Sequence, residues 1–180
     1  LGKVLENFLN PLPISEKEME WEATYREKRE QQRRDELENQ KKWREWLQEN
    51  SHVLRDTENA SNGGVWDATR YLTNYLREHD LTGSKWASPH WETLAPEFGK
   101  EVAEAYRAGC IDYWRKYRPR IMSEGIKNPN STPYAVILGL SGLDMESRHV
   151  SNWPANLTEE EAALACRYAV NELNDFPDWF

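Results

Sequence analysis

The sequence predicts an all-α protein in which antiparallel helix hairpins stack as an α-solenoid-like repeat, with one long charged helix near the N-terminus. Apolar residues recur at steps of three and four along several segments, which is the spacing of one face of an α-helix. One long stretch is dominated by charge yet keeps the patterns of a helix start and of helical ion pairs. Two segments 62 residues apart (153 − 91, from Trp91 to Trp153) share a pattern, as the units of a repeat protein do.

Composition limits the classes of function. The chain has 180 residues, enough for one domain or two small subdomains, and its net charge of −8 disfavours general binding to nucleic acid or anionic membranes. No apolar run is long enough to span a membrane. Cys110 and Cys166 lie in helical patterns, so we expect two reduced, buried thiols and a cytoplasmic location. Because the chain begins with Leu1 and ends at Phe180, we expect a fragment of a longer protein.

Residues 1–50 are predicted to form the tail of one helix, ended by prolines 11 and 13, and then the charged helix. Ser15 and Glu18 form a capping box, and the helical signal continues to about Gln48 or Asn50. No apolar residue lies between Arg26 and Glu36, so a coiled-coil seam is missing. Ion pairs four residues apart predict a protruding helix that is stable in water: Glu22–Arg26, Arg26–Glu30, Glu30–Arg34 and Glu38–Lys42.

Residues 51–180 are predicted to form the helical-repeat domain. Val53 and Leu54 are expected to dock on its core, and a helix is expected over about residues 65–78 after a loop at 58–64. The stretch from Trp91 to Arg120 predicts one long amphipathic helix, with Pro96 in its first turn and Pro119 stopping it near Tyr117 or Arg118. Its inward residues are Val102, Tyr106, Cys110, Tyr113, Trp114 and Tyr117.

Two more helices are predicted after a turn-rich connector. Thr132 is the expected N-cap and Pro133 the first helical residue of the next helix. Residues 134–143 are apolar all round; a buried strand is the alternative, but the length to about Glu146 favours a buried helix. Gly139 and Gly142 would permit a neighbouring helix to approach closely. A second capping box, Thr158 to Glu161, opens a helix that Pro177 ends, with Leu164, Ala165, Tyr168, Ala169 and Leu173 facing inward.

The repeat units are residues 65–122 and 130–180. Each consists of a helix, a loop with one tryptophan and a second helix, and the 62-residue shift aligns Tyr106 with Tyr168 and Trp114 with Phe176. The shift also aligns Cys110 with Glu172, and any two amphipathic helices agree in part. Chance similarity is therefore the alternative to a true repeat.

No motif for catalysis is present. The four histidines are scattered without metal-ligand spacing, no Cys-x-x-Cys occurs, and the sequence contains no P-loop. Ser141 lies in Gly-Leu-Ser-Gly, which is not a nucleophile elbow, so core packing is the expected role. The sequence therefore predicts no catalytic residue, cofactor or metal site, and no enzyme.

One cluster, Trp114 to Arg120, interleaves basic and aromatic residues. It could bind phosphate and stack bases, or contact an acidic patch. Alternatively, the aromatic residues lie in the core and the cations complement the helix C-terminus. Charge reversal at three of its cations (Arg115, Lys116 and Arg118) is expected to weaken partner binding without loss of fold. The candidate partner-binding residues are Arg115, Lys116, Arg118 and Arg120, together with Arg26, Arg29 and Arg33 of the charged helix.

A resemblance to a known class rests on five segments. They are LAPEFGKEVAEAYR (94–107), YWR (113–115), NSTP (130–133), LTEEEA (157–162) and NELNDFP (171–177). Residues 65–180 resemble the helical regions of large bacterial multidomain proteins of the NACHT/STAND-type NTPase class linked to antiphage defence. The NTPase motifs of that class are absent here, so no catalytic residue carries over. The resemblance implies a helical-repeat sensor or scaffold segment of a longer protein.

Together these observations predict a non-enzymatic scaffold or sensor module. Its partner would be another protein or another domain of the same longer chain, without a membrane. The alternative is a nucleic-acid-binding helical domain that uses Trp114 to Arg120, which the negative net charge disfavours.

Overall fold

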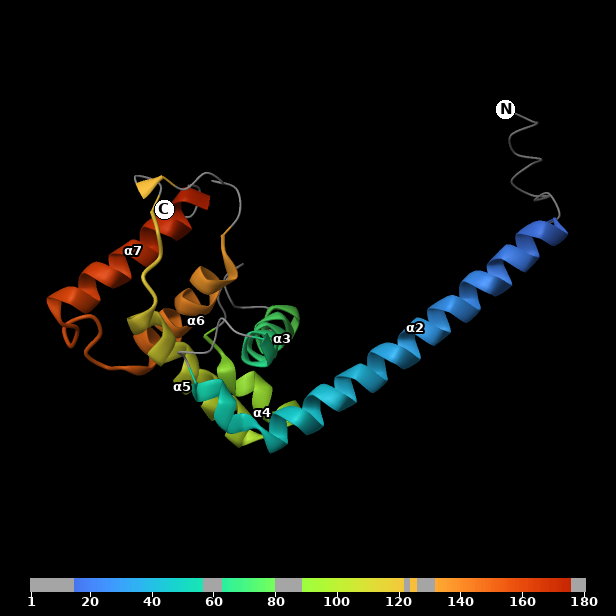
Figure 1. Ribbon diagram of the computed structural model, residues 1–180, viewed down its shortest axis with the longest axis horizontal. Helices are drawn as coiled ribbons and strands as arrows, with labels where there is room; N and C mark the ends of the chain where they lie inside the picture. Colours follow the sequence, from blue (N-terminus) through green and yellow to red (C-terminus); the bar gives the residue numbers. More distant parts are fainter. Residues whose placement is uncertain (1–14, 57–62, 80–88, 122–123, 126–131, 176–180) are drawn as a thin grey trace, which may run out of the picture. The chain divides into compact units, whose positions relative to one another are not determined.

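The computed structural model describes residues 15–56, 63–79, 89–121, 124–125 and 132–175, and within these ranges all regular structure is helical (Figure 1). The all-α prediction is therefore confirmed for the described residues. The expected helix tail in residues 1–10, residues 58–62 of the loop predicted at 58–64, and most of the connector at 123–131 lie outside them; residues 63 and 64 of that loop belong to a helix instead. The elements are α2 (Glu16–Glu49), η1 (Ser51–Arg55), α3 (Gly63–His79), η2 (Trp91–Leu94), α4 (Ala95–Phe98), α5 (Lys100–Lys116), α6 (Tyr134–His149) and α7 (Glu159–Asp175).

The chain divides into two compact units, Leu1–Lys42 and Trp43–Phe180. In the first unit, every described side chain is exposed, so the predicted solvated helix is confirmed. The capping box forms at its start, because the Ser15 N–H and hydroxyl both donate to Glu18 Oε2 at 2.8 Å. Of the predicted ion pairs, Glu38–Lys42 forms at 2.7 Å.

The last two turns of α2 belong to the second unit rather than to the charged helix. Leu47 is fully buried there, and the Trp43 ring stacks on Tyr71 with centroids 5.2 Å apart. Leu54 of η1 joins the same core, as the sequence predicted. The apolar content of these turns explains why the units separate at Lys42 and Trp43 rather than near residue 50.

The prediction of a single helix from Trp91 to Arg120 is wrong, because the chain forms η2, α4 and α5 in succession. The break lies at Gly99, whose φ of 94° is readily adopted only by glycine. Pro96 occupies the first turn of α4, as expected. The last element, α5, ends at Lys116, close to the predicted end, and Tyr117 continues in extended conformation.

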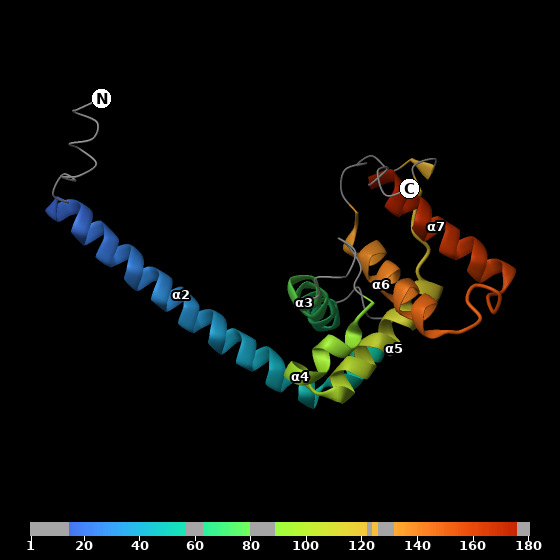
Figure 2. The ribbon, with the colours of Figure 1, turned by 180° about the vertical axis from the view of Figure 1, so that it is seen from behind.

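The buried segment at residues 134–149 is a helix, α6, as the sequence favoured. It packs most extensively against α5, and both views show the two helices side by side (Figures 1 and 2). A Cβ at Gly142 would overlap the Cys110 carbonyl group of α5, and one at Gly139 would overlap the Tyr168 ring of α7. The two glycines therefore permit close packing, as predicted, but toward two different helices.

The predicted start of α6 is wrong by one residue. Pro133 is the N-cap residue and Tyr134 is the first helical residue, and no side chain caps the helix. Instead of capping, the Thr132 hydroxyl is buried without a hydrogen-bond partner among the described residues. The proline ring leaves the preceding threonine outside the helical turn, so its hydroxyl cannot reach the free N–H groups.

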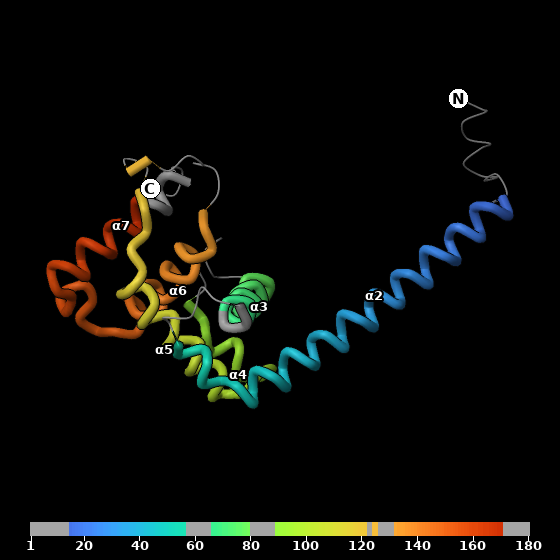
Figure 3. Tube along the Cα trace, viewed as in Figure 1, coloured from blue at the N-terminus to red at the C-terminus, as the bar shows by residue number. Residues whose placement is uncertain are grey.

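The final helix, α7, follows α6 after a turn-rich segment (Figure 3). Its capping box forms: the Thr158 N–H donates to Glu161 at 3.0 Å, and the Glu161 N–H donates to the Thr158 hydroxyl at 3.2 Å. Tyr168 is fully buried in a core cluster with Trp114, Val136 and Leu140. A 62-residue shift brings α5 within three residues of α7 (100 + 62 = 162, against 159), but places α3 nine residues before α6 (63 + 62 = 125, against 134). The stacked-hairpin repeat stays a prediction.

Candidate functional site

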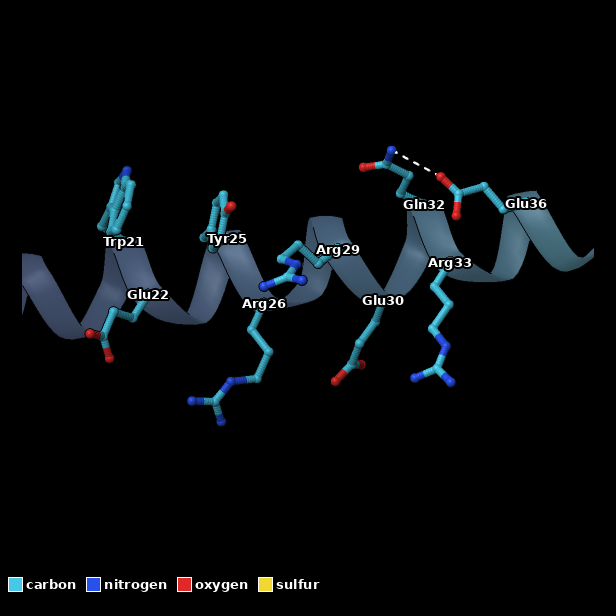
Figure 4. A pocket seen from close by; sticks show the side chains of 9 residues that line it. All are labelled: Trp21, Glu22, Tyr25, Arg26, Arg29, Glu30, Gln32, Arg33 and Glu36. Atoms are coloured by element: carbon cyan, nitrogen blue, oxygen red, sulfur yellow. Dashed lines mark hydrogen bonds between the residues drawn. The ribbon is translucent and has the colours of Figure 1, made fainter. Parts of the chain in front are cut away.

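A strip of aromatic and arginine side chains lies on α2. We define the aromatic–arginine strip as Trp21, Tyr25, Arg26, Arg29 and Arg33 (Figure 4). Trp21 and Tyr25 are 66% and 51% exposed, although large aromatic side chains are mostly buried in folded proteins. All five residues come from one helix, so the strip is an open surface rather than a cavity.

The aromatic pair is ordered by its spacing of four residues. The rings of Trp21 and Tyr25 stack with centroids 5.4 Å apart and planes 11° from parallel. The Arg29 guanidinium carbon lies 5.9 Å from the centre of the Tyr25 ring, within the range of a cation–π contact. Stacking limits the motion of these side chains, so a partner would lose less side-chain entropy on binding them.

The three arginines of the strip were predicted as partner-binding residues, and the structure places them on one exposed surface. Arg26 and Arg33 point to the same side of α2, and Arg29 lies between them and the aromatic pair (Figure 4). In the described helix, Arg26 and Glu22 form no ion pair, although their spacing predicted one. The charges of Arg26 and Glu22 are therefore available to a partner.

Trp114 and Tyr117, the aromatic residues of the Trp114–Arg120 cluster, belong to the core. Trp114 is fully buried, and its indole N–H donates to Glu146 at 2.8 Å. The Tyr117 ring stacks on Tyr113 with centroids 5.4 Å apart. The Trp114 ring therefore has no exposed face on which a base could stack, and one face of the half-buried Tyr117 ring is covered by Tyr113.

The Arg115 guanidinium lies in a network with two carboxylates, on α6 and α7. It donates to both oxygens of Glu146, at 2.6 and 2.5 Å, and to Glu161 at 2.8 Å. Hydrogen bonding to Glu146 is the main reason that the pKa of Arg115 is raised. The network joins α5, α6 and α7, and it makes Arg115 a structural residue.

The pKa of Glu161 is lowered, first by the backbone N–H of Thr158 and then by Arg115. A carboxylate with a lowered pKa stabilises the fold above its ordinary pKa. Its contribution is lost as the pH falls through the lowered value. The bond between Arg115 and Glu161 is therefore fully formed at neutral pH.

The remaining cations of the cluster lie at the surface. Lys116 pairs with Asp112 at 2.8 Å in an exposed i,i+4 bridge, and Arg118 and Arg120 are exposed. Pro119 between them is buried, and its carbonyl oxygen accepts hydrogen bonds from Arg167 at 2.9 and 3.1 Å. Within this cluster, Arg118 and Arg120 are the exposed cations to which no contact has been assigned above, so they are the ones best placed to bind a partner.

Four functional or structural roles were not predicted from the sequence. Trp21 was missed in the strip, although its spacing of four residues from Tyr25 is a visible signal. Glu146 was missed as the partner of Trp114 and Arg115, and Arg167 as the residue that holds the chain after α5. Glu161 was recognised only as a capping residue. The last three roles depend on contacts between residues far apart in the sequence, for which the sequence carries no local signal.

Three hydroxyl groups in the core link three helices. Thr73 Oγ1 lies 2.7 Å from the Tyr106 hydroxyl and 3.0 Å from the Tyr134 hydroxyl, which links α3, α5 and α6. Burial raises the pKa of both tyrosines, so neither releases a proton near neutral pH. Across the described ranges, His, Cys, Asp and Glu side chains form no group of three or more that could hold a metal ion.

The two cysteines are free, but only one is buried. Cys110 is buried in α5, and burial raises its pKa to about 12, whereas Cys166 is exposed. The expectation of two buried thiols is thus wrong for Cys166, because its position on α7 faces away from the inward residue Tyr168.

We expect one thiol per native chain to react with a maleimide at about pH 8, because only an accessible thiolate reacts rapidly. Mass spectrometry after brief labelling would locate the adduct on Cys166. The variant Cys166→Ser should remain unlabelled until denaturant is added. Comparable labelling of Cys110 in the native protein would contradict its burial.

No protein-family model, curated protein or solved structure matches this chain. None of the described helices combines the length and the apolar composition that crossing a membrane requires. The geometry of the chain itself therefore carries the functional argument, and its most distinctive surface is the aromatic–arginine strip of α2.

Proposed function

We propose that this chain is a non-enzymatic helical scaffold or sensor module that binds a partner protein, or another domain of the same longer chain, through the aromatic–arginine strip of α2. One observation carries the proposal: Trp21 and Tyr25 are more than half exposed, stacked, and flanked by arginines. Tryptophan, tyrosine and arginine are the residues that contribute most often to binding energy at protein interfaces.

The second unit would be the folded helical domain of the module. We propose that its helices represent stacked hairpins of an α-solenoid-like repeat, as in the bacterial NACHT/STAND-type proteins linked to antiphage defence that the sequence resembles. The helical order α3, α5, α6 and α7 is compatible with two hairpins. An exposed free thiol at Cys166 suits a reducing compartment, so we place the module in the cytoplasm.

The alternative, nucleic-acid binding through Trp114–Arg120, has weaker support. Its aromatic residue Trp114 is fully buried, and Arg115 is bound to Glu146 and Glu161. Two exposed arginines, Arg118 and Arg120, remain on a chain with a net charge of −8. Phosphate binding by so few cations would be weak, because the electrostatic contribution grows with the number of phosphates neutralised.

We expect the double substitution Trp21→Ala and Tyr25→Ala to reduce capture of protein partners from a bacterial lysate by at least about tenfold, because both anchors of the strip are lost. Immobilised wild-type chain, the variant and a control would be compared by quantitative mass spectrometry after nuclease treatment. The control is Leu37→Ala, which removes another exposed apolar side chain (57% exposed) of the same helix.

Circular dichroism should show equal helix content in all three chains, because the replaced residues are exposed. Equal capture by the variant and the wild type would contradict the proposal. Binding that disappears with nuclease in the wild type would favour the nucleic-acid alternative.

A further inference from the structure

The surface that includes the strip carries both signs of charge. Glu18 and Glu22 lie before Tyr25, whereas Arg26, Arg29 and Arg33 follow it, with Glu30 and Glu36 on the same surface. Residues seven apart on a helix differ by only about 20° around the axis, so Glu22 and Arg29 lie on the same face. When the direction of the helix is reversed, the positions of Glu22 and Glu18 therefore correspond to those of Arg29 and Arg33.

We propose that α2 pairs in antiparallel fashion with α2 of a second copy of this chain, across a two-fold axis between Tyr25 and Arg26. The inference rests on the proposed function, in which α2 is a protein-binding element, and it names the partner. In this arrangement Glu22 of each copy lies opposite Arg29 of the other, and Glu18 opposite Arg33. The symmetry produces each pair twice, as expected for an isologous interface.

The charges that would pair are available. Glu22 forms no ion pair with another described residue. Arg29 contacts only the neighbouring Tyr25 ring in the described part of the chain, at 5.9 Å. The capping bonds of Glu18 use one carboxylate oxygen, Oε2. Pairing with a second copy would therefore break none of the contacts that α2 makes within its own chain.

The aromatic residues add a second element of complementarity. Trp21 and Tyr25 lie together on one side of this face, and Arg26 and Arg33 lie on the other (Figure 4). A two-fold axis between Tyr25 and Arg26 brings like sides together, so Tyr25 of one copy lies beside Tyr25 of the other, and the two Arg26 side chains are neighbours on the opposite side. The two stacked pairs would then form one row of four rings, which removes apolar surface from water.

A second copy fits this surface better than an acidic or a basic partner. An acidic segment would meet Glu18 and Glu22, and a basic segment would meet the three arginines. A partner with arginines opposite Glu18 and Glu22 and carboxylates opposite Arg29 and Arg33 avoids both repulsions, and a reversed copy of α2 provides them. Because exposed ion pairs are individually weak, we expect a dimer that dissociates on dilution and at high salt.

A charge exchange tests this pairing in the 180-residue chain. Glu22→Arg alone and Arg29→Glu alone each place like charges opposite one another twice, so each should weaken dimerisation by about tenfold or more in analytical ultracentrifugation. The double variant Glu22→Arg with Arg29→Glu should restore the dimer. An equimolar mixture of the two single variants should form a heterodimer, because the opposing charges are again complementary.

A matched control exists on the opposite face of α2. Glu27 and Arg34 have the same residue types and the same spacing of seven, and exchanging their charges should leave the dimer unchanged. A wild-type chain that stays monomeric up to millimolar concentration would overturn the pairing, and so would single variants that the exchange fails to restore. If such a monomer still captures another protein through the strip, the proposed function stands and only the inferred partner is wrong.

Discussion

Replacing Arg115 with glutamate is expected to lower the free energy of unfolding by about 3 kcal/mol. The new carboxylate would face Glu146 and Glu161, which now accept hydrogen bonds from the Arg115 guanidinium at 2.5 to 2.8 Å. Like charges in a partly buried site repel strongly, and the hydrogen bonds between α5, α6 and α7 would be lost. Urea denaturation followed by circular dichroism measures this loss.

The control is Arg118→Glu, three residues further along the chain. Arg118 is exposed and lies beyond the end of α5, so its charge reversal should change the free energy of unfolding by less than about 0.5 kcal/mol. Equal effects of the two reversals would show that the Arg115 network does not stabilise the fold. The sequence alone predicted that reversal at Arg115 leaves the fold intact, and the structure argues against that expectation.

Gly142→Ala is expected to lower the free energy of unfolding by about 2 kcal/mol, although alanine is the better helix former by about 1 kcal/mol. The added Cβ would overlap the backbone carbonyl group of Cys110, so α5 and α6 must move apart along their most extensive contact. Thermal and urea denaturation would both report the change. A variant as stable as the wild type would contradict the close approach of these two helices.

Gly139→Ala is the comparison for that substitution. Its added Cβ meets the ring of Tyr168 rather than a backbone group. A side chain can adjust where a backbone cannot, so we expect a loss of about 1 kcal/mol or less. The order of the two effects, Gly142 above Gly139, is the result that the packing predicts.

The parts of the fold that the sequence predicted correctly depend on local patterns. The capping boxes at Ser15 and Thr158 form as expected, and residues 134–149 form a helix. The break at Gly99 was not predictable, because an isolated glycine inside a helical pattern is tolerated at modest cost. Its φ of 94° is selected by packing that places Phe98 and Val102 in the same core.

Site residues were likewise predicted correctly where local sequence determines their position, and not where contacts with distant residues determine it. Arg26, Arg29 and Arg33 were predicted because a charged stretch without an apolar face must lie in water. The role of Arg115 was not predictable, since Glu146 is 31 residues away in sequence and on another helix. Basic residues at a helix end have the same sequence pattern whether they face a partner or an internal carboxylate.

One measurement compares the two surfaces that the sequence singled out. Two variants would be used in parallel to capture proteins from a nuclease-treated bacterial lysate. One carries Trp21→Ala and Tyr25→Ala, and the other carries Arg118→Glu and Arg120→Glu. Because the exposed aromatic pair is the proposed anchor, the first chain should lose at least about tenfold in captured protein and the second should match the wild type. The opposite result would move the binding surface from α2 to the end of α5 and contradict the proposed function.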